Sequence, residues 1–98
     1  MSAETAIIVF DGITEPATSG PIRTAGKGVT FVHVYSAGSS VATVKVQASV
    51  DGVGRKTIKT FTNPDGEGEL WELPPYPFIF LAATELSDGE IHAAVEVW

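Results

Sequence analysis

Few side chains in this sequence have types and spacings that could carry out chemistry. Cysteine is absent, which excludes disulfides, thiolate catalysis and cysteine-based zinc sites. The two histidines, His33 and His92, are far apart in sequence, and two imidazoles without a tight motif are weak evidence for a metal site. We interpret both as structural residues, hydrogen-bonded or exposed, and we expect neither a cofactor nor a bound metal.

The serines and carboxylates do not form a recognisable catalytic set either. No serine lies in a strand-turn-helix nucleophile elbow, and general acid–base catalysis needs a positioned carboxylate pair in a pocket, whereas Asp and Glu lie mostly in predicted turns here. Gly-x-Gly pairs at 26–28, 52–54 and 66–68 fall between predicted strands and not before a helix, so they do not predict a phosphate-binding loop. The sequence therefore predicts a protein that is not an enzyme.

One acidic segment, 63–69 (NPDGEGE), has the alternating oxygen ligands and glycine of the first half of a calcium loop. The bidentate glutamate that completes such a loop is missing, because position 74 is Pro. We interpret the segment as an acidic hairpin, and cation binding by it stays open.

Composition narrows the possible partners. The chain has 98 residues with 44% apolar and 18% charged residues and a net charge of −6, which is typical of one globular domain. The local basic group, Lys45, Arg55, Lys56 and Lys59, is followed closely by acids, so nucleic-acid binding is not expected. No stretch reaches the ~20 apolar residues that span a bilayer, and the first residues lack a basic, apolar signal pattern. We expect synthesis in a reducing cytoplasm and no membrane contact.

A two-residue period of apolar side chains indicates strands. It is clearest at 41–50, where one parity is apolar and the other polar. Further strands are predicted at 4–10, 28–36, 55–62, 68–73, 76–84 and 91–98. Asp-Gly pairs at 51–52, 65–66 and 88–89 supply the positive-φ positions of tight turns. The pattern predicts an all-β protein, a two-sheet antiparallel sandwich of about seven strands, Ig-like or jelly-roll-like, forming one domain over 1–98.

Two segments depart from this pattern. Residues 11–28 form a long loop or arm with room for a short added strand around 22–24; such a loop usually has its own role or is disordered. Residues 78–83 and 29–35 are apolar on both parities, so something must cover a second apolar face. The cover is either the chain itself, through 11–28 or the proline-rich 74–77, or another subunit. Trp71 and Trp98 are candidate anchors for a partner, and core packing explains them equally well.

Three segments carry a family resemblance: 44–52 (VKVQASVDG), 73–79 (LPPYPFI) and 86–91 (LSDGEI). Residues 28–98 resemble small β-sandwich structural proteins of tailed-phage virions, in which these turn and strand signatures recur. Many of those proteins have Trp soon after the first Asp-Gly, where this chain has Val53-Gly54-Arg55. The resemblance implies a non-enzymatic capsid decoration or cement protein, or a head or tail accessory subunit, and no catalytic residues.

The resemblance also implies partners and a location. We expect contact with the major capsid protein or other virion proteins on the capsid exterior, after synthesis in the host cytoplasm. A homo-oligomer, a trimer included, is expected. The alternative is a carbohydrate- or receptor-binding module of a tail or fibre, with scattered aromatic side chains stacking on sugars. The residues predicted to contact a partner are Ile22, Arg23, Phe31, Tyr35, Tyr76, Phe78, Phe80 and Trp98.

Overall fold

The fold is an all-β sandwich, seen in a computed structural model that describes residues 5–24, 30–74 and 76–97. In the described residues there is no helix, and so none with the length and hydropathy needed to cross a membrane. The strands are β1 (Thr5–Ile13), β2 (Ala17–Thr18), β3 (Ile22–Arg23), β4 (Thr30–Ser36), β5 (Val41–Ser49), β6 (Lys56–Thr62), β7 (Glu69–Leu73), β8 (Phe78–Asp88) and β9 (Ile91–Val97).

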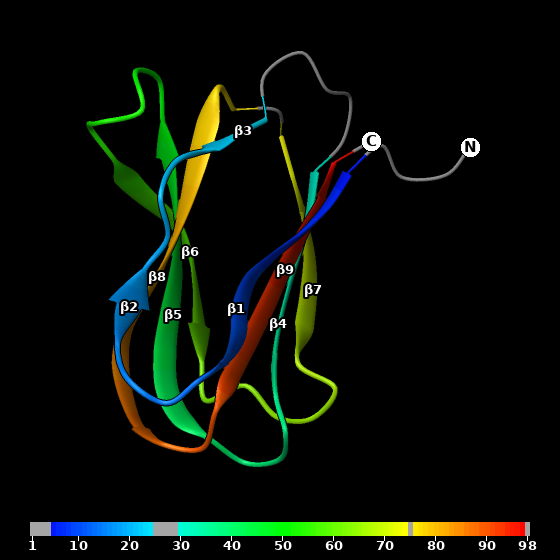
Figure 1. The fold of residues 1–98 in the computed structure, drawn as a ribbon. Helices are drawn as coiled ribbons and strands as arrows, with labels where there is room; N and C mark the ends of the chain where they lie inside the picture. Colours follow the sequence, from blue (N-terminus) through cyan, green and yellow to red (C-terminus); the bar gives the residue numbers. More distant parts are fainter. Residues whose placement is uncertain (1–4, 25–29, 75, 98) are drawn as a thin grey trace.

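The strands form two antiparallel sheets that pack face to face (Figure 1). A four-stranded sheet has the order β1-β9-β4-β7, and a five-stranded sheet has the order β2-β8-β5-β6, with β3 also paired to β8. From β6 onward the chain alternates between the sheets, and β2 and β3 are two pieces of one broken edge strand. Counted that way, eight strands in two sheets are the arrangement of a jelly roll. The expected sandwich is confirmed, and of its two forms this is the jelly roll.

The segment 11–28 differs most from the expectation of a long loop. β1 continues to Ile13, beyond the predicted end at residue 10, and β2 and β3 then pair with β8. A short strand around 22–24 is confirmed as β3, where Ile22 is the partner of Ile79. The arm is therefore mostly sheet edge, and its residues 25–28 lie outside the described ranges. The described residues form nine strand segments where about seven were expected, because β2 and β3, with two residues each, are too short to show a two-residue period.

Turn glycines fix the ends of the strands. The positive φ expected at Gly52 and Gly89 is confirmed, at 82° and 84°. The Asp65-Gly66 pair does not behave this way. The positive φ falls on Asn63 (49°) and Gly68 (68°) and not on residue 66. The Asp65 carboxylate explains the shift, since its Oδ1 accepts from the backbone N–H of Gly68 at 2.8 Å and so closes the turn further along the chain.

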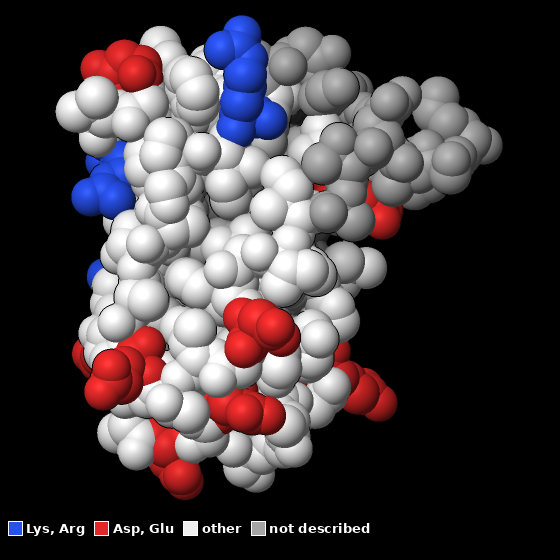
Figure 2. Space-filling view, in the orientation of Figure 1, with Lys and Arg blue, Asp and Glu red and all other residues white. Residues whose placement is uncertain are grey.

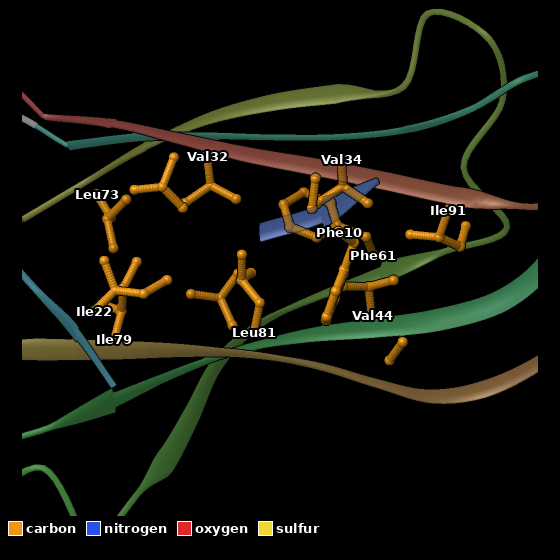
Figure 3. Close-up of a cluster of buried hydrophobic side chains, with 14 of the residues drawn as sticks. Phe10, Ile22, Val32, Val34, Val44, Phe61, Leu73, Ile79, Leu81 and Ile91 are labelled. Carbon is orange, nitrogen blue, oxygen red and sulfur yellow. The ribbon is translucent and has the colours of Figure 1, made fainter. Parts of the chain in front are cut away.

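The core lies between the sheets and is made of aliphatic side chains around two phenylalanines, Phe10 and Phe61 (Figure 3). β4 and β9 both show strict alternation of buried and half-buried residues, as a strand with one face in the core must. Phe61 is completely buried. Burial of such a side chain contributes roughly 1.5–3 kcal/mol, so the inward parity dictates the register of every strand.

Candidate binding surfaces

The residues predicted to contact one partner lie on opposite faces of the sandwich. Phe31 and Tyr35 belong to β4 in the four-stranded sheet. They alternate along this strand with the buried Val32 and Val34, so their side chains point outward, away from the core. Ile22 is a core residue, only 8% exposed, so its side chain is not available to a partner and that part of the prediction is wrong. It faces inward because its register partner Ile79 does. Trp98 lies outside the described residues.

The remaining predicted residues belong to the five-stranded sheet. Arg23 is the register partner of Phe78, and its guanidinium lies 5.8 Å from the centre of that ring. Arg55 lies over Phe80 at 4.8 Å, and Phe80 is only 6% exposed. Tyr76 is half-buried against the core. The second apolar parity of β8 is therefore covered by the chain itself, through Arg23 of the arm and through a loop after β5 that the sequence did not single out.

The outer face of the four-stranded sheet is the larger uncovered surface. We define this docking face by outward residues that the strand registers place side by side. They are Ile8, Phe31, His33, Tyr35, Leu70, His92 and Ala94. Ile8 and Leu70 are 66% and 69% exposed, although both are large and aliphatic. Nothing in the described part of the chain covers them.

Three rings form a ladder across the middle of the docking face. Tyr35 stacks on His92 with centroids 4.9 Å apart and planes at 9°, and it contacts His33 on the other side at 4.8 Å. The Nε2 atom of His33 is hydrogen-bonded to the backbone oxygen of Glu67 at 2.8 Å. These contacts hold the rings in place, so the face is preformed and loses little side-chain entropy on binding.

The ring ladder also determines whether the two histidines can bind one metal ion together. His92 lies 3.4 Å from a Glu90 oxygen and 3.9 Å from an Asp11 oxygen. Tyr35 separates it from His33, and the described residues include no group of three or more metal-ligating side chains. The interpretation of His33 as a hydrogen-bonded structural residue fits this geometry, and carboxylates rim one edge of the docking face.

The second candidate surface is a concave one, at the end of the sandwich where β5 connects to β6. This cavity has a volume of about 680 Å³. We call it the basic-end cavity, and its walls are Ala48, Ser49, Val50, Asp51, Gly54, Arg55, Lys56, Ile58 and Tyr76. Among the described residues, no carboxylate lies within ion-pair distance of Arg55 or Lys56.

Asp51 does not neutralise these cations, because its carboxylate serves its own loop. Its Oδ1 accepts from the backbone N–H groups of Val53 and Gly54 at 2.8 and 2.9 Å. Those two hydrogen bonds favour the charged form and lower the pKa of the Asp51 carboxyl. The loop shape that places Arg55 and Lys56 at the cavity is thus maintained by an ionised aspartate.

Charge is divided between the two ends of the molecule. Figure 2 shows most acidic side chains gathered at the end opposite the basic-end cavity, with the cations toward the cavity end. The four connections at the acidic end carry Glu15, Asp65, Glu67 and Glu90, Asp88 ends β8 beside them, and these connections include no Lys or Arg. The cavity end carries Arg23, Arg55 and Lys56. The potential therefore changes sign along the long axis of the strands.

Comparison with known proteins identifies the fold and not the family. No protein-family model matches the sequence, and no curated protein matches it. The structure is similar to the SPBc2 prophage-derived protein YomS, with a TM-score of 0.75 and 10% identity over 96% of this chain and 92% of YomS. It is also similar to the PBSX exported protein XepA, with a TM-score of 0.71 and 14% identity over 95% of this chain and 37% of XepA.

The fold also occurs as one part of much longer enzymes. A putative α-L-fucosidase from Bacteroides thetaiotaomicron gives a TM-score of 0.60 at 12% identity, over 99% of this chain and 22% of the enzyme. The family 89 glycoside hydrolase of Clostridium perfringens gives a TM-score of 0.58 at 12% identity, over 97% of this chain and 14% of the enzyme. At such identities the similarity shows the shared sandwich alone. The structures similar to this chain thus include two phage-derived proteins and parts of two glycosidases.

Sequence reasoning missed the exposure of Ile8 and Leu70, and it named Arg55 and Lys56 only as part of a basic group without a binding role. Leu70 was assigned to a strand together with Trp71 and Leu73, and the structure shows that Leu70 has the opposite, solvent-facing parity, which it shares with Glu72. Trp71 packs against the core, so the core explanation for it holds. The signal for Leu70 was present in the sequence, because the two-residue period of the strand places it on the face opposite Trp71 and Leu73.

Proposed function

We propose that this protein is a non-enzymatic structural protein of a phage virion, a capsid decoration or cement protein that binds the outer surface of the major capsid protein lattice. The observation that carries the proposal is the docking face, with its exposed Ile8 and Leu70 around a preformed ring ladder. The whole-length similarity to the prophage-derived protein YomS supports a phage context for that face.

The shape of the molecule suits attachment by a sheet. The molecule extends 36 × 32 × 17 Å, so its broad faces are sheet faces and its thickness is small. A standard interface buries about 800 Å² on each partner, which one broad face can supply. A flat subunit bound through one sheet would lie close to the shell and contact more than one capsid protein, and lattice contacts then gain from effective concentration.

The chemistry of the described residues supports binding over catalysis. The hydroxyls of Ser19, Ser40 and Ser49 make hydrogen bonds to backbone atoms and Asp51, and no serine of the described ranges is hydrogen-bonded to a histidine. The net charge of −6 favours a position on the outer shell, away from packaged DNA.

The test is addition of purified protein to virions of the encoding phage that lack it. Bound copies per particle would be counted for the wild type, for Ile8→Asp and for Leu70→Asp. A charge placed at either side of the ring ladder, within the buried patch, should weaken binding by tenfold or more, about 1.4 kcal/mol or above. The matched control is Val53→Asp, because Val53 is 79% exposed and lies far from the docking face.

Circular dichroism and thermal unfolding would show that each variant folds, which is expected because the substituted side chains are exposed. Full binding by both docking-face variants would refute the site. Absence of wild-type binding to any such particle would refute the decoration function itself.

A second candidate is a carbohydrate- or receptor-binding module of a tail or fibre. The observation in its favour is that the same sandwich occurs within two glycosidases. Binding of the isolated protein to a glycan array, together with no affinity for particles, would favour this alternative.

A further inference from the structure

The geometry of the basic-end cavity points to a ligand site separate from the docking face. We infer that this cavity binds an acidic saccharide, a sugar unit that carries a carboxylate or a phosphate. The inference does not depend on the proposed function, because the cavity and the docking face share no residue. A virion protein with both sites would be held by one sheet and present the other end to an anionic glycan.

The size and lining of the cavity suit a small organic ligand. A volume of about 680 Å³ falls within the usual range of ligand sites, which are mainly apolar with a few placed polar groups. Val50, Ile58 and Tyr76 supply apolar wall, including one aromatic side chain. The C–H face of a sugar ring packs against such surfaces, while a free inorganic anion would leave them unused.

The charge of the ligand follows from the two cations. Arg55 and Lys56 both line the cavity, and both lack an ion-pair partner among the described residues. Asp51, the one acid in the lining, is engaged by its own loop amides, so the lining has a surplus of one positive charge. Because the other end of the molecule is acidic, an anion approaching from solvent is directed toward this cavity.

Arg55 is also held in a defined orientation. Its guanidinium rests over the Phe80 ring at 4.8 Å, a cation–π contact that restricts the side chain before any ligand arrives. An arginine fixed in this way presents a planar pair of donors to carboxylate or phosphate. Lys56 adds a point charge from the first residue of β6.

The cavity wall opposite these cations is fixed by the arm. Thr24, completely buried, donates its hydroxyl to the backbone oxygen of Tyr76, and its N–H donates to the Pro77 oxygen at 3.1 Å. These two bonds tie the segment that carries Tyr76 to β3. The site is thus built from three distant parts of the chain, which explains why no local motif reveals it.

In the experiment, the full chain is titrated with four probes, and binding is measured by isothermal titration calorimetry and by amide NMR shifts. Trigalacturonate and glucose 6-phosphate are the acidic probes, maltotriose is the neutral probe, and laurate is a non-sugar anion. We expect both acidic sugars to shift amides within 48–58 and at Tyr76, and to bind at least tenfold more tightly than maltotriose. Tighter binding of trigalacturonate indicates a polymer as the source, and tighter binding of glucose 6-phosphate indicates a free sugar phosphate.

Variants separate the site from general attraction. Arg55→Gln and Lys56→Gln should each weaken acidic-sugar binding at least fivefold. Lys45→Gln, which removes the same charge from β5 outside the cavity, should have no effect. Equal loss in all three variants, equal affinity for maltotriose, preference for laurate, or no binding of either acidic sugar would overturn the inference. Particle binding by Arg55→Gln should stay at the wild-type level, so failure here leaves the docking face unaffected.

Discussion

Among the described glycines, Gly68 has the least room for a Cβ, and it packs against a strand of the docking face. A Cβ placed on Gly68 would lie 2.1 Å from the backbone oxygen of Val34 and 2.5 Å from Cβ of Tyr35. The φ of Gly68 is +68°, in the left-handed region. Gly68→Ala therefore combines an unfavourable backbone conformation with a clash against a strand that cannot yield easily.

The cost can be worked out from the structure. A non-glycine residue in the left-handed region costs about 1–2 kcal/mol. The clash must open by more than 1 Å, which separates the start of β7 from β4 at the Glu69–Val34 pair. Loss of one or two ladder hydrogen bonds there costs roughly 1 kcal/mol each. We expect a total loss of about 2–4 kcal/mol in unfolding free energy, or a fall in Tm of about 10–20 °C for a chain of this size.

The assay is urea and thermal unfolding of three proteins, with Gly66→Ala as the matched control. Gly66 lies in the same turn, has no positive φ, and a Cβ there would be 3.9 Å from its nearest neighbour, the Ser36 oxygen. That substitution should stay within about 0.5 kcal/mol of wild type. If Gly68→Ala were as stable as Gly66→Ala, the described approach of this turn to β4 would be wrong, and so would the position of Leu70 beside it.

Three further predictions concern the core, the arm and the Asp51 loop. Phe61→Ala should lower the unfolding free energy by about 3–5 kcal/mol, because Phe61 is completely buried; a loss below about 1 kcal/mol in urea unfolding would contradict its place in the core. Thr24→Val should cost about 1–2 kcal/mol, because it leaves the Tyr76 oxygen without its donor, and amide exchange should rise at 76–78. Hydroxyl-retaining Thr24→Ser is the control. Asp51→Asn should be less stable than wild type at pH 7, because the pKa of Asp51 is lowered in the fold. The carboxylate contribution is present above the unfolded pKa and is lost as pH falls through the lowered folded pKa, so the acid unfolding curves of the two proteins should converge once the pH lies below the usual titration range of an aspartate.

Strands with one buried face could be predicted from the sequence, because their inward positions are apolar and their outward positions are polar. In 41–50 the alternation is nearly complete, and the observed strand is Val41–Ser49. β2 and β3 have only two residues each, so no period can show in them, and their pairing with β8 depends on long-range register. The turn after β6 was misplaced by two residues because a side-chain hydrogen bond from Asp65 overrides the usual Asp-Gly turn.

The candidate sites were harder to predict than the fold. The two-residue period divides the side chains of a strand between two faces, but it does not show which face is covered by other parts of the chain. Phe80 and Tyr35 have the same pattern, aromatic on the solvent parity of an apolar strand. Arg55 lies over Phe80, which is 6% exposed, while Tyr35 is half-buried and its ring lies between the rings of two histidines. The cover of Phe80 comes from a loop 25 residues earlier in the chain, which no local pattern encodes.

That difference gives the two apolar parities opposite roles. On β8 the rings of the outward phenylalanines contact arginine side chains and hold them in place. The outer surface there therefore carries oriented positive charge at the cavity end. On β4 the outward rings stack on one another and leave Ile8 and Leu70 uncovered beside them. A single substitution separates the two roles. Arg55→Ala should expose Phe80 and weaken anion binding, yet leave particle binding unchanged, because no docking-face residue contacts that arginine. If Arg55→Ala also abolished particle binding, the two faces would have to act as one surface, and the assignment of the partner to the four-stranded sheet would fail.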